Sequence, residues 1–299
     1  MPKPTTLKTL LLSIATSISF YTPAHAQDNN NQLTQKSSPL PQQITNNNLE
    51  ERTLILGGNI MLGCIKSGIA AAYRNENILQ NCAKGSIGGL ITHIGEEIAS
   101  HNKYLFVGAA GKLIHDAGTS MSDNIMRGEE LFSQYQTDFG PLNFTFRSNA
   151  PPKITYTLTP LYGIAFNLYL GNKLDLKQSL YNLNLIFIDE KFSDINSTKT
   201  IEVKGYTTGN IIGYKTEIDP QTRNKVLSHE QNHALFWSKL RFTNWIGPKI
   251  ELLGDISKQY DYQQDLSEFL VMIPNEIIAK GHGKAFSITE NIAYSMQRE

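Results

Sequence analysis

The sequence predicts an α+β fold: a Gly-rich helical segment, then an antiparallel β-sheet, then C-terminal helices that carry an H-E-x-x-H motif. Three observations predict it. Apolar residues recur at helical spacing in residues 51–128, alternate with period two in residues 129–218, and return to helical spacing in residues 219–299. The chain has 299 residues, of which 40% are hydrophobic. It can therefore build a substantial core from these three segments.

Charge is balanced over the chain, with 27 basic and 27 acidic residues. A protein that binds nucleic acid through phosphate contacts normally carries a basic surface, so we expect no nucleic-acid partner. The sequence also lacks a G-x-x-x-x-G-K-[ST] loop, a G-x-G-x-x-G loop and a G-x-S-x-G elbow. Phosphate-binding loops and serine-hydrolase chemistry are therefore not supported.

The N-terminus has the pattern of a secretory signal peptide over residues 1–26. Lys3 and Lys8 precede the apolar stretch Leu10–Phe20, and Ala24–Ala26 supplies an A-x-A cleavage site. The alternative is an N-terminal membrane anchor, but the apolar stretch is shorter than the roughly 20 residues that a span needs. We expect an exported protein, periplasmic or extracellular, that is soluble or only peripherally attached to a membrane.

The next segment, residues 27–50, is rich in Asn and Gln and contains Pro39 and Pro41. Such a composition buries too little apolar surface to offset the entropy that is lost on ordering. We therefore predict a disordered linker between the cleavage site and the folded body.

Three helices are predicted in the Gly-rich segment: Asn59–Tyr73, Asn77–Ser100 and Tyr104–Met126. Glycine inside a helix costs about 1 kcal/mol relative to alanine, so its abundance here needs a reason. Small residues four apart, such as Gly85 and Gly89, allow two helix backbones to approach closely. Two interpretations stay open: a tightly packed helical hairpin in water, and a segment packed against a membrane or a partner.

Polar side chains favour the hairpin in water, because they interrupt the apolar surface of these helices. They are Glu96, Glu97, His101, Lys103, Lys112 and Asp116. The two cysteines of the chain, Cys64 and Cys82, lie on the first and second predicted helices. In an oxidising compartment an even pair suggests a disulfide, and the alternative is two buried thiols. A disulfide would tie the first helix to the second.

Short stretches with period-two alternation or apolar character predict an antiparallel sheet of about five or six strands. They are Leu142–Phe146, Ile154–Leu158, Ile164–Leu170, Leu183–Ile188, Ile201–Val203 and Ile211–Tyr214. Turn residues separate them, among them Gly140 followed by Pro141 and Gly209 followed by Asn210.

The strongest functional signal is an H-E-x-x-H motif at His229, Glu230 and His233. Asp219 and Pro220 suit the N-cap and first position of a helix that would contain the motif. On a helix, positions four apart share a face, so both imidazoles can bind one metal ion. Glu230 beside them can act as the general base for an activated water. We predict zinc as the cofactor.

Catalytic zinc needs a third protein ligand. The metzincin pattern is excluded, because Phe236 and Lys239 stand where it requires Gly and His. A carboxylate from a later helix is the remaining arrangement. Glu290 is the preferred candidate, because Ser287 can cap its helix and Ala293, one turn later, allows close helix approach. The other candidates are Glu251, Glu268, Glu276, Asp255, Asp261 and Asp265.

The H-E-x-x-H helix and the later Glu-x-x-Ala-Tyr segment that begins at Glu290 resemble the minimal gluzincin-type zinc metallopeptidases. The resemblance covers residues 219–299. It implies that His229, His233 and Glu290 bind zinc, that Glu230 is the general base, and that a peptide or protein is the substrate. The whole chain, with its Gly-rich helices, sheet and Leu-Ser-His-Glu segment, also resembles a group of uncharacterised exported bacterial proteins.

Other interpretations stay open. The motif histidines are alternatively ordinary hydrogen-bonded residues, or ligands of a structural metal site without turnover. From another class, the alternative is a non-enzymatic envelope protein that binds a partner or a membrane surface. His115 and Asp116 are adjacent, but neighbouring helix residues point in different directions, so no catalytic pair is expected. Gln231, if buried within the motif, would need hydrogen-bond partners.

Overall fold

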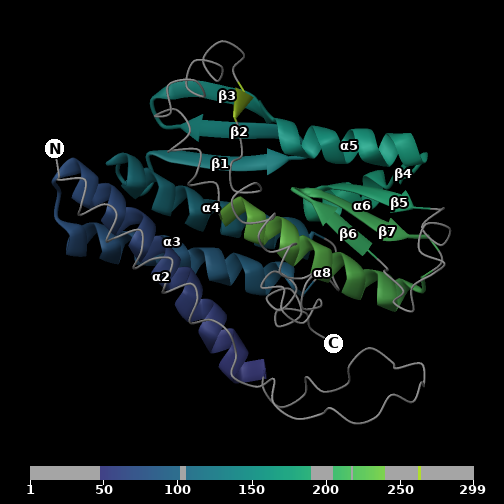
Figure 1. Cartoon of the computed structure of the whole chain (residues 1–299), viewed down its shortest axis with the longest axis horizontal. Helices are drawn as coiled ribbons and strands as arrows, with labels where there is room; N and C mark the ends of the chain where they lie inside the picture. The colour runs from purple at the N-terminus through teal and green to yellow at the C-terminus, as the bar shows by residue number, and fades with distance from the viewer. Residues whose placement is uncertain (1–47, 102–105, 190–204, 217, 240–261, 264–299) are drawn as a thin grey trace, which may run out of the picture. The chain divides into compact units, whose positions relative to one another are not determined.

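The computed structural model describes residues 48–101, 106–189, 205–216, 218–239 and 262–263 (Figure 1). Within these ranges the chain is an α+β protein with six helices and two β-sheets. The predicted signal peptide, the linker before residue 48, the strand at Ile201–Val203 and the helix with Glu290 lie outside the described residues. They stay predictions.

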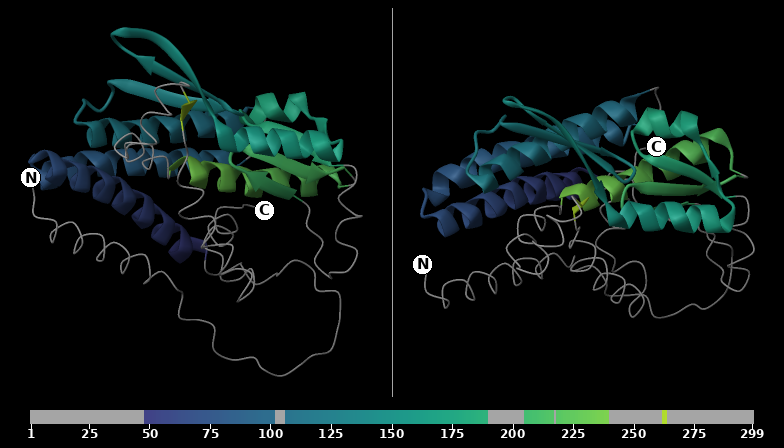
Figure 2. Two further views of the ribbon diagram at one scale, coloured as in Figure 1. Left: turned by 45° about the horizontal axis from the view of Figure 1, so that its top comes forward. Right: turned by 90° about the horizontal axis from the view of Figure 1, so that it is seen from above.

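The three helices of the Gly-rich segment lie side by side (Figures 1 and 2). They are α2 (Asn48–Arg74), α3 (Ile78–Ala99) and α4 (Val107–Arg127). The predicted bounds are close for α3 and α4, whereas α2 begins at Asn48 instead of Asn59. Asn77 caps α3, because its side-chain oxygen accepts a hydrogen bond from the backbone N–H of Gln80 at 3.0 Å. Gly128, at φ 80°, ends α4.

Glycines create close contacts between these helices. Gly85 and Gly89 on α3 face α2, where a β-carbon would clash with backbone atoms of Gly63 and Asn59 respectively. Gly88, on the neighbouring face of α3, meets α4 in the same way. The prediction that small residues allow close backbone approach is therefore confirmed. It also explains why the helices tolerate the intrinsic cost of glycine.

Alanine at Gly89 is expected to lower the free energy of unfolding by about 1–3 kcal/mol, because the added methyl group overpacks the α2–α3 contact. Gly57 of α2 is the matched control, since a β-carbon there meets nothing within 4 Å. Gly57→Ala should raise the free energy of unfolding by up to about 1 kcal/mol. Urea denaturation of both variants checks this. If both substitutions stabilise the protein, the close contact between α2 and α3 at Gly89 is absent.

Cys64 and Cys82, the pair expected to form a disulfide, are bonded, with their Cα atoms 3.9 Å apart. The bond joins α2 to α3. Among the described helices, the part of α2 from Arg52 to Arg74 is long and apolar enough to cross a membrane. Core helices of soluble proteins meet the same criterion, so this feature alone does not place the chain in a bilayer.

The first sheet, sheet A, has the strand order β1–β2–β3–β8. Its strands are β1 (Gln134–Phe139), β2 (Leu142–Arg147), β3 (Ala150–Thr157) and β8 (Tyr262–Gln263). The first three pair antiparallel, and Gly140, at φ 57°, forms the turn between β1 and β2. β8 pairs parallel to β3. β1 packs against α4, so polar side chains of this strand can reach the helix.

The second sheet, sheet B, has the order β4–β5–β7–β6. Its strands are β4 (Lys173–Leu174), β5 (Leu185–Asp189), β6 (Gly205–Thr208) and β7 (Ile211–Lys215). β5 and β7 are parallel, and the outer pairs are antiparallel. The expectation of a single antiparallel sheet is therefore wrong: antiparallel pairing prevails, but it is divided between two sheets, each with one parallel pair. A parallel pair needs a crossover connection, which the turn signals did not indicate.

The stretch Ile164–Leu170, predicted as a strand, belongs to helix α5 (Leu158–Leu170). The run is short and apolar, and periodicity alone does not distinguish such a strand from a helix. Packing distinguishes them, because Gly163 lets α5 lie directly over Ile211 of β7. A further short helix, α6 (Leu176–Asn182), precedes β5 and was not predicted.

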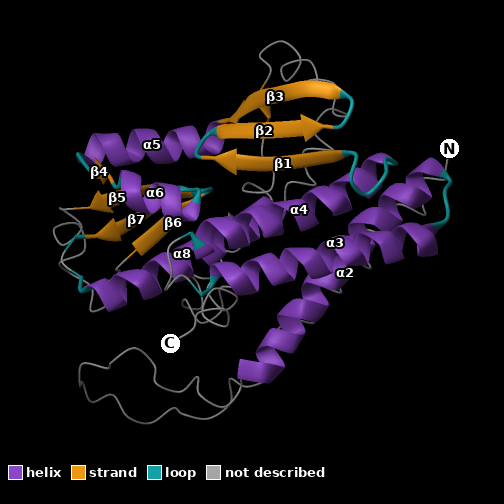
Figure 3. Ribbon diagram, turned by 180° about the vertical axis from the view of Figure 1, so that it is seen from behind, coloured by secondary structure: helices purple, strands orange, loops and turns teal. Residues whose placement is uncertain are grey.

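Sheet B lies between α5 and α8 (Pro220–Lys239), which cover its opposite faces (Figure 3). Ile212 and Tyr214 of β7 point toward α8 and form a buried core with Ile186 and Leu227. On its other side α8 contacts α3 and α4. The helix with the H-E-x-x-H motif is therefore an internal element.

Candidate metal centre

Helix α8 is capped as its sequence predicts. Asp219 Oδ1 accepts hydrogen bonds from the backbone N–H groups of Gln221 and Thr222, both at 3.0 Å. Every residue from 227 to 235 is buried, because sheet B covers one side of the helix and α3 and α4 cover the other. Polar residues of the motif must therefore find partners inside the protein.

The two motif histidines form a close pair. Nε2 of His229 lies 3.2 Å from Nε2 of His233, and the ring planes are 82° apart. Both residues are buried, with 9% and 8% relative exposure. Two nitrogens bound to one tetrahedral zinc ion lie about 3.3 Å apart. The pair thus has the spacing of two zinc ligands, and the same spacing fits a hydrogen bond from one imidazole to the other.

A third ligand is not among the described residues. Within the part of the chain that the structure describes, no group of three or more His, Cys, Asp or Glu side chains is arranged to hold a metal ion. Glu290 and the other carboxylate candidates lie outside the described residues. The structure brings His229 and His233 together, whereas the contribution of Glu290 stays a prediction.

Glu230 points from α8 toward sheet B. Its Oε2 accepts a hydrogen bond from Thr207 Oγ1 of β6 at 2.7 Å. The residue is buried, with 7% relative exposure. The carboxylate that the motif assigns as general base is therefore adjacent to a strand at the edge of the described sheet B. The sequence indicated the role of Glu230 but not this contact with Thr207.

The amide nitrogen of Gln231 has a hydrogen-bond partner, whereas its buried Oε1 has none among the described residues. Its Nε2 donates to the backbone oxygen of Gly108, near the start of α4, at 3.0 Å. Ser228 Oγ donates to the backbone oxygen of Ser100, at the end of α3, at 2.9 Å. These two bonds fasten α8 to α3 and α4. Asn232 is also buried, and neither atom of its amide has a hydrogen-bond partner among the described residues.

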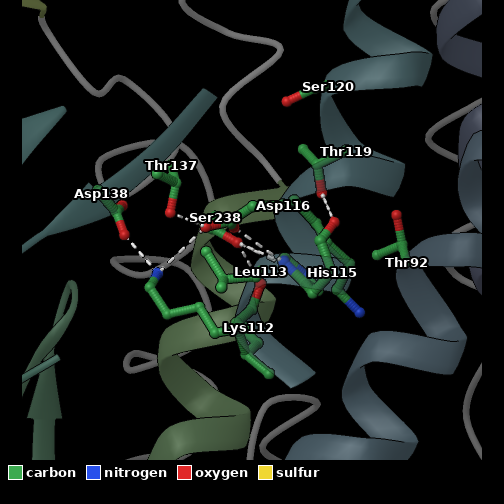
Figure 4. Close-up of polar contacts among 12 residues, drawn as sticks. Thr92, Lys112, Leu113, His115, Asp116, Thr119, Ser120, Thr137, Asp138 and Ser238 are labelled. Atoms are coloured by element: carbon green, nitrogen blue, oxygen red, sulfur yellow. Dashed lines mark hydrogen bonds and ion pairs between the residues drawn. The ribbon is translucent and has the colours of Figure 1, made fainter. Parts of the chain in front are cut away.

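A second buried polar cluster, which no sequence motif indicated, lies where α2, α3, α4, α8 and β1 meet; Figure 4 shows its α4 side. We call it the ionic cluster, and it comprises Asn59, Glu96, Lys112, His115, Asp116, Asp138, Ser238 and Lys239. Glu96, Lys112 and Asp116, three of the polar residues that interrupt the apolar surface of the helices, are buried inside the protein. The helical spacing of apolar residues predicted where the helices lie in the sequence, but it did not predict which helix faces other elements would cover.

Lys112 is the cation on the α4 side of the ionic cluster (Figure 4). It pairs with Asp138 of β1 and lies 3.6 Å from a carboxylate oxygen of Asp116. Thr137 Oγ1 donates a hydrogen bond to Asp116 Oδ2 at 2.7 Å. Buried charges are stable in this setting because each has an opposite charge or a hydrogen-bond donor beside it.

His115 contacts its neighbour Asp116, contrary to the expectation from helix geometry. Nδ1 lies 3.2 Å from Asp116 Oδ1, because both side chains enter the same polar layer. Burial lowers the pKa of His115, although Asp116 and Glu96 act in the opposite direction, so the imidazole is neutral at neutral pH. Ser238 Oγ lies 3.4 Å from Nδ1 but donates to the backbone oxygen of Leu235 at 2.8 Å. We interpret this buried group as structural.

Glu96 joins α3 to α8 and α2. Its Oε1 lies 2.5 Å from Lys239 Nζ, and its Oε2 accepts a hydrogen bond from Asn59 Nδ2 at 2.6 Å. Burial alone would raise the pKa of Glu96, but the charge of Lys239, together with hydrogen bonds from Lys239 and Asn59, outweighs burial, so the pKa lies below its ordinary value. Glu96 and Lys239 are thus an ion pair at neutral pH, at the last turn of α8.

Fold and site together define an α+β protein in which a buried helix presents an H-E-x-x-H histidine pair. No protein-family model, no curated protein and no solved structure matches the chain. The chemistry of its own residues is therefore the basis for assigning a function.

Proposed function

We propose that the chain is an exported zinc-dependent metallopeptidase that hydrolyses peptide bonds. The observation that carries the proposal is the 3.2 Å separation of the His229 and His233 Nε2 atoms on a buried helix. Imidazole nitrogens are preferred zinc donors, and this spacing is the one that two such donors take on one ion. Glu290 is the proposed third ligand, and residues 1–26 are the proposed export signal.

The residues of the site have separate roles in this proposal. Zinc bound there would polarise a peptide carbonyl and lower the pKa of a water molecule toward about 7. Glu230 accepts the proton of the attacking water and passes it to the leaving amine. β6 lies beside Glu230 and is an edge strand among the described strands. An extended peptide that pairs with this edge would bring its carbonyl near the motif.

Zinc content tests the proposal. Purified residues 27–299 are expected to contain about one zinc ion per chain, and His229→Ala and His233→Ala should lose most of it. Glu230→Gln should keep the zinc but cleave labelled casein at least about 100-fold more slowly, because the general base is lost. His101→Ala is the matched control, since His101 is half-buried and lies outside the motif. Atomic absorption gives the metal content.

Four outcomes would change the assignment of the function or of a residue's role. Wild type without stoichiometric zinc at neutral pH would contradict the proposal. Loss of zinc from Glu230→Gln would make Glu230 a ligand instead of a base. Stoichiometric zinc without cleavage of any peptide would indicate a structural metal site. Retention of zinc by Glu290→Gln would direct the search for the third ligand to the other carboxylates.

A second candidate, from another class, is a non-enzymatic envelope protein that binds a partner or a membrane surface. Exposed apolar side chains on one side of α3 favour this second candidate. Ile87, Leu90 and Ile94 are exposed at helical spacing, whereas Glu96 on the same helix is buried. Exposed apolar residues that cluster on one face are typical of interaction surfaces. Metal content separates the candidates, because a zinc-free wild type would leave this second function as the preferred one.

A further inference from the structure

Strand β6 contacts the Glu230 carboxylate through one hydroxyl group. Thr207 Oγ1 lies 2.7 Å from Glu230 Oε2 and 3.0 Å from the backbone oxygen of Glu230. Thr207 is paired with Ile212 of β7, so the register of the two strands sets the position of the hydroxyl. Its one hydrogen can serve the carboxylate, which is the stronger acceptor when ionised.

The same strand also leaves room for the Glu230 side chain. A β-carbon at Gly205 would lie 3.0 Å from both Cγ and Oε1 of Glu230. Positions two apart on a strand point to the same face, so Gly205 and Thr207 both face α8. β6 therefore offers space at one position and a hydrogen-bond donor at the other to a single carboxylate.

We propose that Thr207 is a positioning residue that orients the Glu230 carboxylate for proton transfer; the inference rests on the proposed peptidase function. The terminal torsion of a glutamate side chain is broad, so a carboxylate without a donor samples many orientations. The hydroxyl on Oε2 restricts that torsion and leaves Oε1 to accept the proton from the attacking water.

Valine at position 207 removes the hydroxyl and keeps the shape of the side chain. Thr207→Val is expected to lower kcat for casein cleavage about 10- to 100-fold. KM and zinc content should stay unchanged. Thr207→Ser should restore most of the rate, because it restores the donor. Thr208→Val is the matched control on the same strand, since its side chain points to the α5 face.

A second readout does not depend on catalysis. In metal-free protein at pH 7, the carboxyl carbon of Glu230 can be observed by NMR and assigned by its absence in Glu230→Gln. Its chemical shift should move in Thr207→Val, because the carboxylate loses its hydrogen-bond donor, and it should return toward the wild-type position in Thr207→Ser.

These readouts distinguish failure of the inference from failure of the proposed function. A wild type without zinc and without cleavage would refute the peptidase, while the carboxyl chemical shift still reports on the contact. An unchanged chemical shift in Thr207→Val would overturn the inference. So would an active Thr207→Val enzyme with wild-type kcat, or a Thr207→Ser enzyme as slow as Thr207→Val.

Discussion

Methionine in place of Lys239 is expected to lower the free energy of unfolding by about 3–5 kcal/mol, which is the cost of removing one partner of a buried ion pair. Lys239 is 5% exposed and Glu96 is 3% exposed, so the carboxylate would be left inside the protein without its cation. The hydrogen bond from Lys239 to Asn59 would be lost as well. Urea denaturation at pH 7 measures the difference in the free energy of unfolding between the wild type and Lys239→Met.

Two comparisons make this result specific. Lys177→Met, at an exposed lysine of α6, should change the free energy of unfolding by less than about 0.5 kcal/mol. The double variant Glu96→Met with Lys239→Met should recover most of the loss, because two apolar side chains can replace a buried pair. If the double variant is as unstable as Lys239→Met, the instability of the single variant does not come from loss of the ion pair.

The effect should also depend on pH in one direction. The folded pKa of Glu96 lies below its ordinary value of 4.5. The stabilisation that the pair contributes is therefore present above about pH 4.5 and is lost as the pH falls through the folded pKa. The difference between wild type and Lys239→Met should accordingly shrink on acidification, and a difference that grows would contradict the assigned ionisation state.

Loss of the disulfide should have the next largest effect. The bond between Cys64 and Cys82 closes a loop over a sequence separation of 18 residues and ties α2 to α3. Replacing both residues with alanine is expected to cost about 3 kcal/mol, mainly because the unfolded chain gains freedom. The transition midpoint in urea, measured without reductant, checks this.

Reduction provides the control for this prediction. Dithiothreitol should lower the stability of the wild type by a similar amount and should leave the Cys64→Ala, Cys82→Ala variant unchanged. If reductant destabilises both proteins equally, the loss has another origin. If it affects neither, the two sulfurs do not form a bond in the protein as produced.

Much of the helical structure could be predicted from the sequence, because it rests on local periodicity. The bounds of α3 and α4 follow from apolar spacing, and Asp219 marks the start of α8. The close contact at Gly85 and Gly89 is also implied by their spacing, since two small residues four apart lie on one helix face.

The strands were harder to predict, because short apolar segments carry little periodic information. Ile164–Leu170 could pair as a strand or pack as a helix, and Gly163 over Ile211 favours the helix only after sheet B is assembled. β6, with four residues, is too short to show alternation. The contact of Thr207 with Glu230 could not be predicted without this strand.

By itself the sequence determined that His229 and His233 share a helix face, because positions four apart do so in any α-helix. It also determined that Glu230 lies beside them. Only the tertiary structure decided that Thr207 meets Glu230 and that Glu96 meets Lys239. The physical reason is that each of these pairs joins two different elements, and the packing of those elements depends on side-chain shape and burial throughout the fold. Helix geometry, in contrast, is set by interactions within a few residues.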